Sequence, residues 1–317
     1  MTDSMQVFDR QAVRRNRDRA AARWHAHDFL HAQAAEQLLE RLGEVRRQFP
    51  LVLELGCKGG TLAPRLLGHN GIERIIQCDL SPQMTARAAA NGQPSVVVDE
   101  EALPFAPGTF DLVVSLLDLQ WVNDLPGALL QVRQSLKSDG FFLAALLGGD
   151  TLYELRTSLM LAEIEVSGGA APRVSAFAEL RDVAGLLQRA GFALPVADRE
   201  VLTVSYEDPL KLLRELRGMG ASNALMERSR RGLKRSVLMR ALEVYGERFA
   251  LPDGSLPVTF EIYWLAGWAP AAAQPKPLPR GSATQRLADA LGGRERGSGV
   301  AVRPTRSEQT DEDGSSS

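Results

Sequence analysis

The sequence predicts an α/β fold in which a mostly parallel β-sheet carries helices on both faces. Three observations support this prediction. Five short apolar runs alternate with helical segments between residues 50 and 150, a pattern typical of parallel sheets. Acidic residues stand at the carboxyl ends of the first three runs, the edge at which open α/β sheets bind ligands. The chain of 317 residues is 44% hydrophobic, which is enough to build a sizeable core.

Residues 10–47 are predicted to be helical, because apolar residues recur at helical spacing until Gln48, Phe49 and Pro50 end the pattern. The five strands are short apolar runs bounded by turn residues, at 51–55, 74–78, 95–98, 110–115 and 141–147. Helices between them are predicted at 61–67, from Ser81-Pro82 onward, and at 125–136, with a turn at 138–140.

After Gly149 the pattern changes. Helices are predicted at 150–165 and 176–190, a strand at 191–205, a largely helical stretch at 208–249 interrupted near 218–220, and a last strand at 257–268. We therefore divide the chain into four parts. They are an N-terminal helical segment (1–48), a sheet core (49–149), a helical insertion or lid with the last strands (150–269), and a disordered tail (270–317) with a short amphipathic piece at 284–291.

Composition excludes several classes of protein. The 37 basic and 39 acidic side chains give a net charge of -2, so no general electrostatic field favours nucleic acid. Cys57 and Cys78 form neither a disulfide framework nor a CxxC zinc pattern, and free buried thiols in a reducing compartment are expected. No apolar run is long enough to span a membrane, and the N-terminus lacks a signal-peptide core. A cytoplasmic protein is predicted.

A nucleoside-binding site is predicted at the strand ends. Glycines at Gly56, Gly59 and Gly60 follow the first strand and allow a tight turn with close approach to a ligand. Asp79 ends the second strand, where a carboxylate accepts hydrogen bonds from two ribose hydroxyls in dinucleotide folds. Asp99 ends the third strand, where it would accept from an adenine amino group, with Glu100 or Glu101 as its alternatives.

This order of motifs resembles the class I S-adenosylmethionine (SAM)-dependent methyltransferases. The run from Asp99 to Phe105, followed by the run from Gly108 to Val113, resembles their type 11 branch. The resemblance implies a Rossmann-like, seven-stranded, mostly parallel sheet, SAM as the cofactor, and an enzyme. The residues assigned to cofactor binding are Glu54, Gly56, Cys57, Gly60, Asp79, Leu80, Asp99, Glu100 and Ser115.

A narrower resemblance covers nearly the whole folded chain. It rests on the segments 8–10, 119–126, 148–156, 218–223 and 263–268. They are similar to bacterial relatives of mitochondrial complex I assembly factor 5, a family that is itself similar to the malonyl-carrier-protein O-methyltransferase of the biotin pathway. This resemblance implies that the partner is the iron–sulfur subunit of complex I and that the reaction is modification of an arginine, by hydroxylation in the mitochondrial members.

One departure from the family pattern concerns the glycine loop. The usual Gly-x-Gly-x-Gly has Lys58 at its middle position. A β-carbon there would crowd the methionine part of SAM, unless the side chain points to solvent and leaves the loop intact.

The two strand-end acids also have plainer interpretations: Glu54 as a cap of the loop amides, and Asp79 as a charge beside the Ser81-Pro82 helix start.

The acceptor site is predicted after the fourth strand. Leu116 and Leu117 would form an apolar wall there, unless they only pack in the core. Trp121 would stack on a guanidinium or close over SAM, unless it is only a packing anchor. Tyr153 and Arg156 lie three apart on one helix face and fit a pocket lid, next to Asp150, which alternatively caps that helix. These three aromatic and basic residues, Trp121, Tyr153 and Arg156, are the candidate catalytic residues.

Two further groups have open interpretations. Met219, Ser222 and Asn223 form either a loop over the active site or an ordinary turn between helices. His27 and His31 have the i, i+4 spacing of a metal-binding pair, but no third ligand has a clear spacing, so an exposed polar face is favoured and no metal site is predicted.

Three functions are compatible with this pattern. The first is SAM-dependent methyl transfer to a carboxylate of a small molecule or carrier protein, which needs no general base and fits a fourth strand without an adjacent His or Lys. The second follows the family resemblance and is modification of an arginine on the iron–sulfur subunit of complex I. The third is a non-catalytic assembly chaperone with a degenerate methyltransferase fold, which Lys58 motivates.

Overall fold

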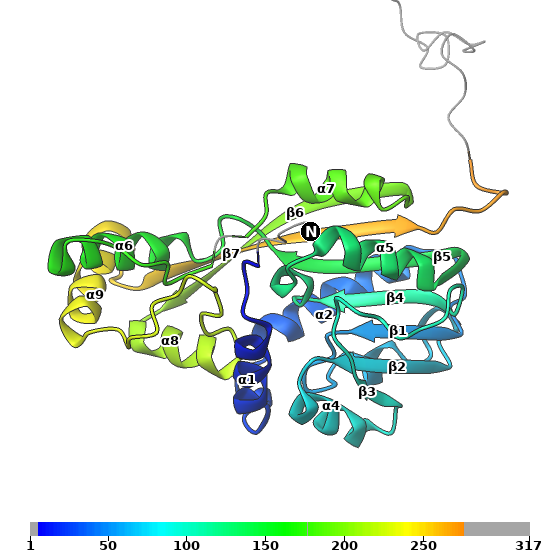
Figure 1. Ribbon diagram of the computed structural model, residues 1–317, viewed down its shortest axis with the longest axis horizontal. Coiled ribbons are helices and arrows are strands. Elements are labelled where there is room, and N and C mark those ends of the chain that lie inside the picture. Colours follow the sequence, from blue (N-terminus) through cyan, green and yellow to red (C-terminus); the bar gives the residue numbers. More distant parts are fainter. Residues whose placement is uncertain (1–5, 176, 276–317) are drawn as a thin grey trace, which may run out of the picture. The chain divides into compact units, whose positions relative to one another are not determined.

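Seven strands form one sheet in the order β3-β2-β1-β4-β5-β7-β6 in the computed structural model, which describes residues 6–175 and 177–275 (Figure 1). The strands are β1 (Leu51–Leu55), β2 (Arg74–Asp79), β3 (Ser95–Val97), β4 (Phe110–Leu116), β5 (Leu136–Leu147), β6 (Ala193–Tyr206) and β7 (Leu256–Trp268). Strands β1 to β5 pair in parallel, and β7 runs antiparallel to both β5 and β6. The predicted α/β fold with a mostly parallel seven-stranded sheet is confirmed.

Nine α-helices lie among the residues that the structure describes. They are α1 (Arg10–Ala21), α2 (Phe29–Gly43), α3 (Ala63–Leu66), α4 (Pro82–Ala88), α5 (Leu125–Ser135), α6 (Tyr153–Ser167), α7 (Leu180–Arg189), α8 (Pro209–Gly218) and α9 (Arg235–Phe249). Ser81 caps α4 as predicted, since its Oγ accepts a hydrogen bond from the N–H of Met84. None of the described helices is long and apolar enough to cross a membrane.

The sheet core is two-sided because successive residues of a strand point to opposite faces. Val52 belongs to the cluster that packs against α2 and the α6–α9 region, whereas Leu53 belongs to the cluster under α5 and α7. Both side chains are fully buried. The helices on the two faces leave the carboxyl ends of the parallel strands free. The strand order reverses between β1 and β4, since β2 and β3 continue on one side of β1 and β4 and β5 on the other, and ligands bind at such a switch point.

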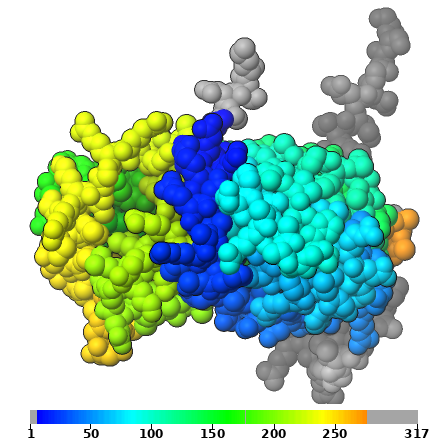
Figure 2. Space-filling model, turned by 90° about the horizontal axis from the view of Figure 1, so that it is seen from below, coloured from blue at the N-terminus to red at the C-terminus, as the bar shows by residue number. Residues whose placement is uncertain are grey.

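The helix α1 lies at this carboxyl edge and not on either face of the sheet. In Figure 2 it forms a dark blue band between the cyan part of the sheet domain and the yellow-green segment that contains α8. We call α6, α8 and α9, together with the connection 219–234, the lid. Beyond the end of β5, the strands β6 and β7 pair alone from Val201–Glu261 to Tyr206–Leu256, and the lid is built around this extension (Figure 1).

Three element predictions were wrong. The predicted helix at 10–47 is two helices separated by a turn at Trp24–Ala26, because the fully buried Trp24 ring enters the core beside Gly59. The predicted turn at 138–140 belongs to β5, where backbone hydrogen bonds to Ala269 continue the pairing with β7. The interruption near 218–220 extends over the whole connection from α8 to α9. The amphipathic piece at 284–291 lies outside the described residues.

Candidate cofactor site and acceptor cavity

The glycine loop follows β1 and needs glycine at two of its positions. Gly56 and Gly60 adopt φ values of +78° and +74°, which residues with side chains rarely adopt. A β-carbon on residue 60 would lie 2.6 Å from the Cα of Ala88, and one on residue 56 would lie 2.0 Å from the Cγ of Asp118. The loop is therefore tightly enclosed by α4 and by the residues that follow β4.

Asp79, at the end of β2, organises the loop. Its Oδ2 accepts a hydrogen bond from the backbone N–H of Lys58 at 3.1 Å, and its Oδ1 accepts one from the backbone N–H of Ser81 at 2.8 Å. The Nη1 of Arg17, from α1, donates to the same Oδ1 at 3.2 Å. The carboxylate is fully buried and is held on all sides by donors, as an anion at this depth must be.

Glu54 lies at the end of β1 and is buried with its Oε2 unpartnered. Burial, reinforced by the charge of Asp79, raises the pKa of Glu54 from 4.5 to about 8. The carboxyl therefore holds a proton near neutral pH while no cation approaches it. It does not cap the loop amides, because no hydrogen bond joins it to them, and it stands ready to accept a hydrogen bond from a ligand.

We expect the substitution Glu54→Gln to remove part of the pH dependence of folding stability. The folded chain keeps a proton that the unfolded chain releases between pH 4.5 and about 8. The stability that this proton contributes is complete below pH 4.5 and is lost as the pH rises through 8, by at most about 1.4 kcal/mol per pH unit. Glutamine mimics the protonated form. Urea unfolding of both proteins across this range measures the difference, and parallel curves would contradict the assignment.

The acids after β3 differ in exposure. Glu100 is fully buried, whereas the side chain of Asp99 is 39% exposed. Both pair with Arg10 of α1, which also donates to the carbonyl oxygen of Trp121. Glu101 accepts a hydrogen bond from the backbone N–H of Asn123. Glu100 is thus the buried acid at this strand end, and Asp99 lies beside it at the protein surface.

Arg17 joins three buried carboxylates, Asp79, Glu100 and Asp118, which we call the acid cluster. Its Nη1 donates to Glu100 at 2.8 Å, and its Nη2 lies 2.6 Å from Oδ1 of Asp118. Burial raises the pKa of Asp118, while the cations Arg17 and Lys58 oppose this shift. Arg17 and Arg10 together overcome the burial of Glu100 and hold its pKa well below the ordinary value.

Lys58 points inward. Its side chain is only 5% exposed, and its Nζ pairs with Asp118 and lies 3.9 Å from Asp79. The residue adopts a left-handed φ of +49°, which is uncommon for a residue with a side chain. The alternative in which Lys58 points to solvent was wrong, because Asp118 provides a buried partner for its ammonium group.

Cys57 and Cys78 are both free and buried, as expected from their lack of a disulfide pattern. Burial raises the pKa of the Cys78 thiol to about 12 and raises that of Cys57 as well. Both thiols therefore stay protonated and act as packing groups, since only a thiolate is an effective nucleophile.

These residues fit an S-adenosyl group. The enclosed loop leaves backbone at positions where a β-carbon would clash. Asp79 supplies two carboxylate oxygens for ribose hydroxyls, and the unpartnered Oε2 of Glu54 suits the methionine ammonium group. The cations Arg17 and Lys58 contact the same acids, so their contacts must change when a nucleoside uses Asp79.

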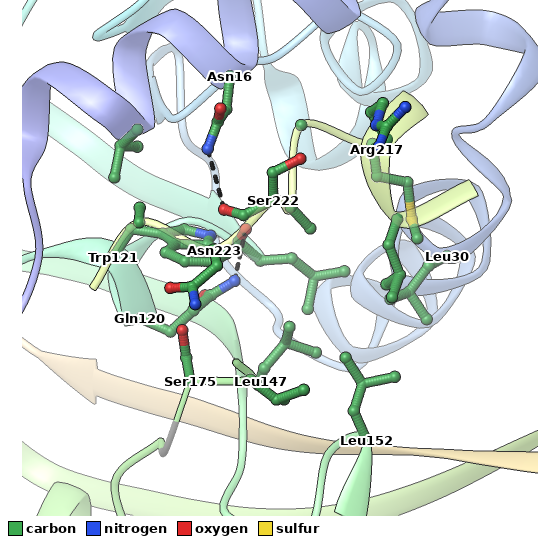
Figure 3. A pocket seen from close by; sticks show the side chains of 18 of the residues that line it. Asn16, Leu30, Gln120, Trp121, Leu147, Leu152, Ser175, Arg217, Ser222 and Asn223 are labelled. Carbon is green, nitrogen blue, oxygen red and sulfur yellow. Dashed lines mark hydrogen bonds between the residues drawn. The ribbon is translucent and has the colours of Figure 1, made fainter. Parts of the chain in front are cut away.

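A cavity of about 280 Å³ lies between α1, α2, the end of β4 and the lid (Figure 3). Its walls are largely aliphatic, with Trp121, Phe177 and Phe260 as aromatic members and the amides Asn16, Gln120 and Asn223 among the polar ones. Arg17 and Lys58 also line it, so the cavity adjoins the cofactor site. The Nδ2 of Asn16 donates to the carbonyl oxygen of Ser222 at 2.9 Å, which connects α1 to the lid (Figure 3).

The structure brings some of the predicted acceptor residues to this cavity. Trp121 packs edge-on against Phe8 and Phe177 and also forms part of the cavity wall. Leu117 lines it, as do the lid residues Met219, Ser222 and Asn223. The hydroxyl of Ser115 instead donates to the carbonyl oxygen of Leu55 and links β4 to the end of β1. Leu80 packs beside Phe8 and Trp121.

Tyr153 and Arg156 are not among the residues that line the cavity. Tyr153 is 41% exposed and packs against Phe249. Arg156 donates from its Nη2 to the carbonyl oxygens of Gly149 and Thr151, and so supports the turn before α6. Helical spacing placed the two on one face, but that face is turned away from the cavity.

Two residues at the site, Arg17 and Asp118, were missed by the sequence interpretation. The exposed polar face expected for His27 and His31 was wrong for His31, which is buried and lines the cavity with both ring nitrogens unpartnered. Arg10 and Arg17 lie seven residues apart on one face of α1, and that spacing was an available signal. Asp118 follows the fourth strand, as the other site acids follow theirs.

The fold, the glycine loop and the ordered strand-end acids define a class I SAM-dependent methyltransferase. The methyltransferase domain family matches residues 53–144. Among solved structures, the YcgJ protein from Bacillus subtilis is similar in fold, with a TM-score of 0.53 at 14% identity over 76% of this chain and 100% of that one.

Two curated relatives narrow the class. The mitochondrial arginine-hydroxylase NDUFAF5 of Danio rerio is 41% identical over 289 residues, which are 90% of this chain and 89% of that protein. The malonyl-[acyl-carrier protein] O-methyltransferase of Halorhodospira halophila is 36% identical over 83% of this chain and 89% of that protein. The chain belongs to the NDUFAF5-related family of class I methyltransferases.

Proposed function

We propose that the chain is a SAM-dependent enzyme that modifies an arginine on the iron–sulfur subunit of respiratory complex I. The observation that carries this proposal is that the similarity to an arginine-hydroxylase spans 90% of the chain, far beyond the methyltransferase domain at 53–144. The cavity walls supplied by α1, α2 and the lid lie within the additional segments. The likeness therefore extends to the parts of the chain that form the cavity.

The roles of the residues follow from their positions. Glu54, Asp79 and the Asp99–Glu100 pair hold the cofactor at the carboxyl edge of the sheet. Bound SAM supplies an activated methyl group on a sulfonium, so the protein mainly has to orient the acceptor. The Trp121 ring offers a flat face to a guanidinium, and α1 with the lid forms part of the cavity wall.

Mass spectrometry of the iron–sulfur subunit tests this proposal. We expect one arginine of this subunit to carry a methyl or hydroxyl mass increment in the parent strain and to lose it in a strain lacking this chain. Restoring the chain should restore the increment. An arginine of unchanged mass in the deletion strain would contradict the proposal, and the size of the lost increment would identify the modification.

The Asp79→Asn variant separates an enzyme from a purely structural assembly factor. We expect it to fail to restore the arginine modification and the assembly of complex I, although it folds. Full assembly with this variant would instead support the non-catalytic alternative, in which the methyltransferase fold only binds the partner.

The free buried thiols Cys57 and Cys78 support a reducing compartment, the cytoplasm, as the site of action.

Carboxyl O-methylation of a small molecule or carrier protein is the second candidate. Among the described residues, no Asp or Glu lines the cavity, whereas Arg17, Lys58, Arg173 and Arg217 do. Such a wall favours an anionic acceptor. The two functions are distinguished by incubating the enzyme with methyl-labelled SAM and either a malonyl-carrier protein or an arginine peptide. A base-labile label on the carrier would support the ester-forming reaction.

A further inference from the structure

The guanidinium of Arg17 rests in a buried binding site of its own. Its side chain is 3% exposed, and its three carboxylate partners are fully buried. The contacts measure 3.2 Å to Asp79, 2.8 Å to Glu100 and 2.6 Å to Asp118. Carboxylates in this arrangement match the planar, forked donors of a guanidinium. The position is therefore suited to a guanidinium group, whichever chain supplies it.

The three acids do not all serve the cofactor. Asp79 and Glu100 end β2 and follow β3, where the ribose and adenine are assigned. Asp118 comes two residues after β4, the strand end next to the acceptor cavity. Its Cγ lies against the glycine loop, 2.0 Å from the position that a β-carbon of residue 56 would take. Its Oδ2 is buried without a hydrogen-bond partner, so Asp118 retains an acceptor for a further donor.

The cavity wall explains how a substrate reaches this acid. The two cations that pair with Asp118, Arg17 and Lys58, both line the cavity, whereas Asp118 does not, so these side chains separate the carboxylate from the cavity. Arg17 belongs to α1, which is tied to the lid through Asn16 and Ser222 and through Asp9 and Arg228. If a substrate guanidinium replaces that of Arg17, one positive group takes the place of another. The buried carboxylate then never lacks a cationic partner, a state that would be costly.

We propose that Asp118 receives the guanidinium of the arginine substrate and that Arg17 occupies this position in the substrate-free enzyme. The proposal rests on the proposed arginine modification and assigns a binding residue to it. It also accounts for the lack of acidic residues in the cavity wall: the acid that recognises the substrate is covered by the group that the substrate replaces. Lys58 remains paired with Asp118 through the same Oδ1 that Arg17 contacts, and its positive charge opposes the rise in the pKa of Asp118 that burial causes.

Chemical rescue tests the site without any substrate protein. The Arg17→Met variant keeps the apolar stem but lacks the guanidinium, and its thermal midpoint should fall. Guanidinium chloride at about 50 mM should raise this midpoint by about 2–4 °C relative to sodium chloride of equal concentration, and should not raise that of the wild type. The double variant Arg17→Met/Asp118→Asn should show no rescue. Rescue that persists without the Asp118 carboxylate, or no rescue in Arg17→Met, would overturn the proposal.

A second measurement uses the full-length chain with Arg17 in place. Calorimetry with an arginine peptide, in the presence of saturating S-adenosylhomocysteine, should show at least tenfold weaker peptide binding to Asp118→Asn than to the wild type. A separate titration with S-adenosylhomocysteine should show a smaller loss of affinity. Equal peptide affinity would contradict the assignment. Neither assay uses complex I, so a negative result in both would contradict the role of Asp118 without deciding whether the chain modifies an arginine. The deletion strain decides that question independently of Asp118.

Discussion

Glu100→Gln should lower the free energy of unfolding by about 3–5 kcal/mol, the usual effect of removing one partner from a buried ion pair. Glu100 is fully buried and contacts both Arg10 and Arg17. Without its charge, the buried guanidinium of Arg17 keeps only Asp79 and Asp118, and those two acids also serve the ammonium of Lys58. Arg17 and Lys58 would then share these two carboxylates, while Arg10 would keep Asp99 and Glu101.

The neighbouring Asp99→Asn substitution is the matched control. Asp99 also pairs with Arg10, at 2.7 Å, but its side chain is 39% exposed. An ion pair in contact with water contributes about 0–1 kcal/mol, so this variant should unfold close to the wild type. Urea denaturation of the three proteins gives the comparison. Equal losses of stability for the two variants would show that the buried acid cluster does not stabilise the fold as we describe.

Asp79→Asn should weaken SAM binding by about two to four powers of ten. A carboxylate that accepts two ribose hydroxyls contributes about 1.5–3 kcal/mol for each charge-assisted hydrogen bond, and each 1.4 kcal/mol corresponds to a factor of ten. An amide cannot replace both bonds, because one of its two polar ends is a donor. Calorimetric titration with SAM measures the change directly.

A control for this variant is Asp111→Asn at the other end of the sheet. Asp111 opens β4 at its amino end, where it accepts from the N–H of Leu51 and pairs with Lys137. The substitution is the same change from aspartate to asparagine, but residue 111 lies away from the cofactor edge. The affinity for SAM should therefore remain within about twofold of the wild type. A similar loss in both variants would point to a general effect on the fold and contradict the ribose assignment of Asp79.

Local patterns in the sequence were sufficient for most of the sheet. The run Leu51–Leu55 and its glycine loop predicted β1 and its turn, because a buried parallel strand reads as a continuous apolar run. The Ser81-Pro82 start of α4 was predicted from capping alone. Where tertiary contacts decide, the prediction failed: Trp24 breaks the first helix to reach the core, a choice that helical spacing does not encode.

The site shows the same division. The strand-end acids were predictable because parallel strands bring their carboxyl ends to one edge. Arg17 and Asp118 were not predicted, because their contact joins α1 to β4 across 101 residues of chain, and this pairing depends on how α1 crosses the edge. Lys58 departs from the usual glycine pattern of the loop, and its buried partner Asp118 could not be inferred from the sequence around it. Tyr153 and Arg156 share a helix face that is directed elsewhere.

A crystal structure of the full chain with bound S-adenosylhomocysteine is the most direct test of the central claim that the acid edge is the cofactor site. The account predicts the ribose on Asp79, the adenine beside Asp99 and Glu100, and an Arg17 that no longer contacts Asp79. A nucleoside bound outside the carboxyl edge of β1 to β3, or one bound with every contact of Arg17 unchanged, would contradict it.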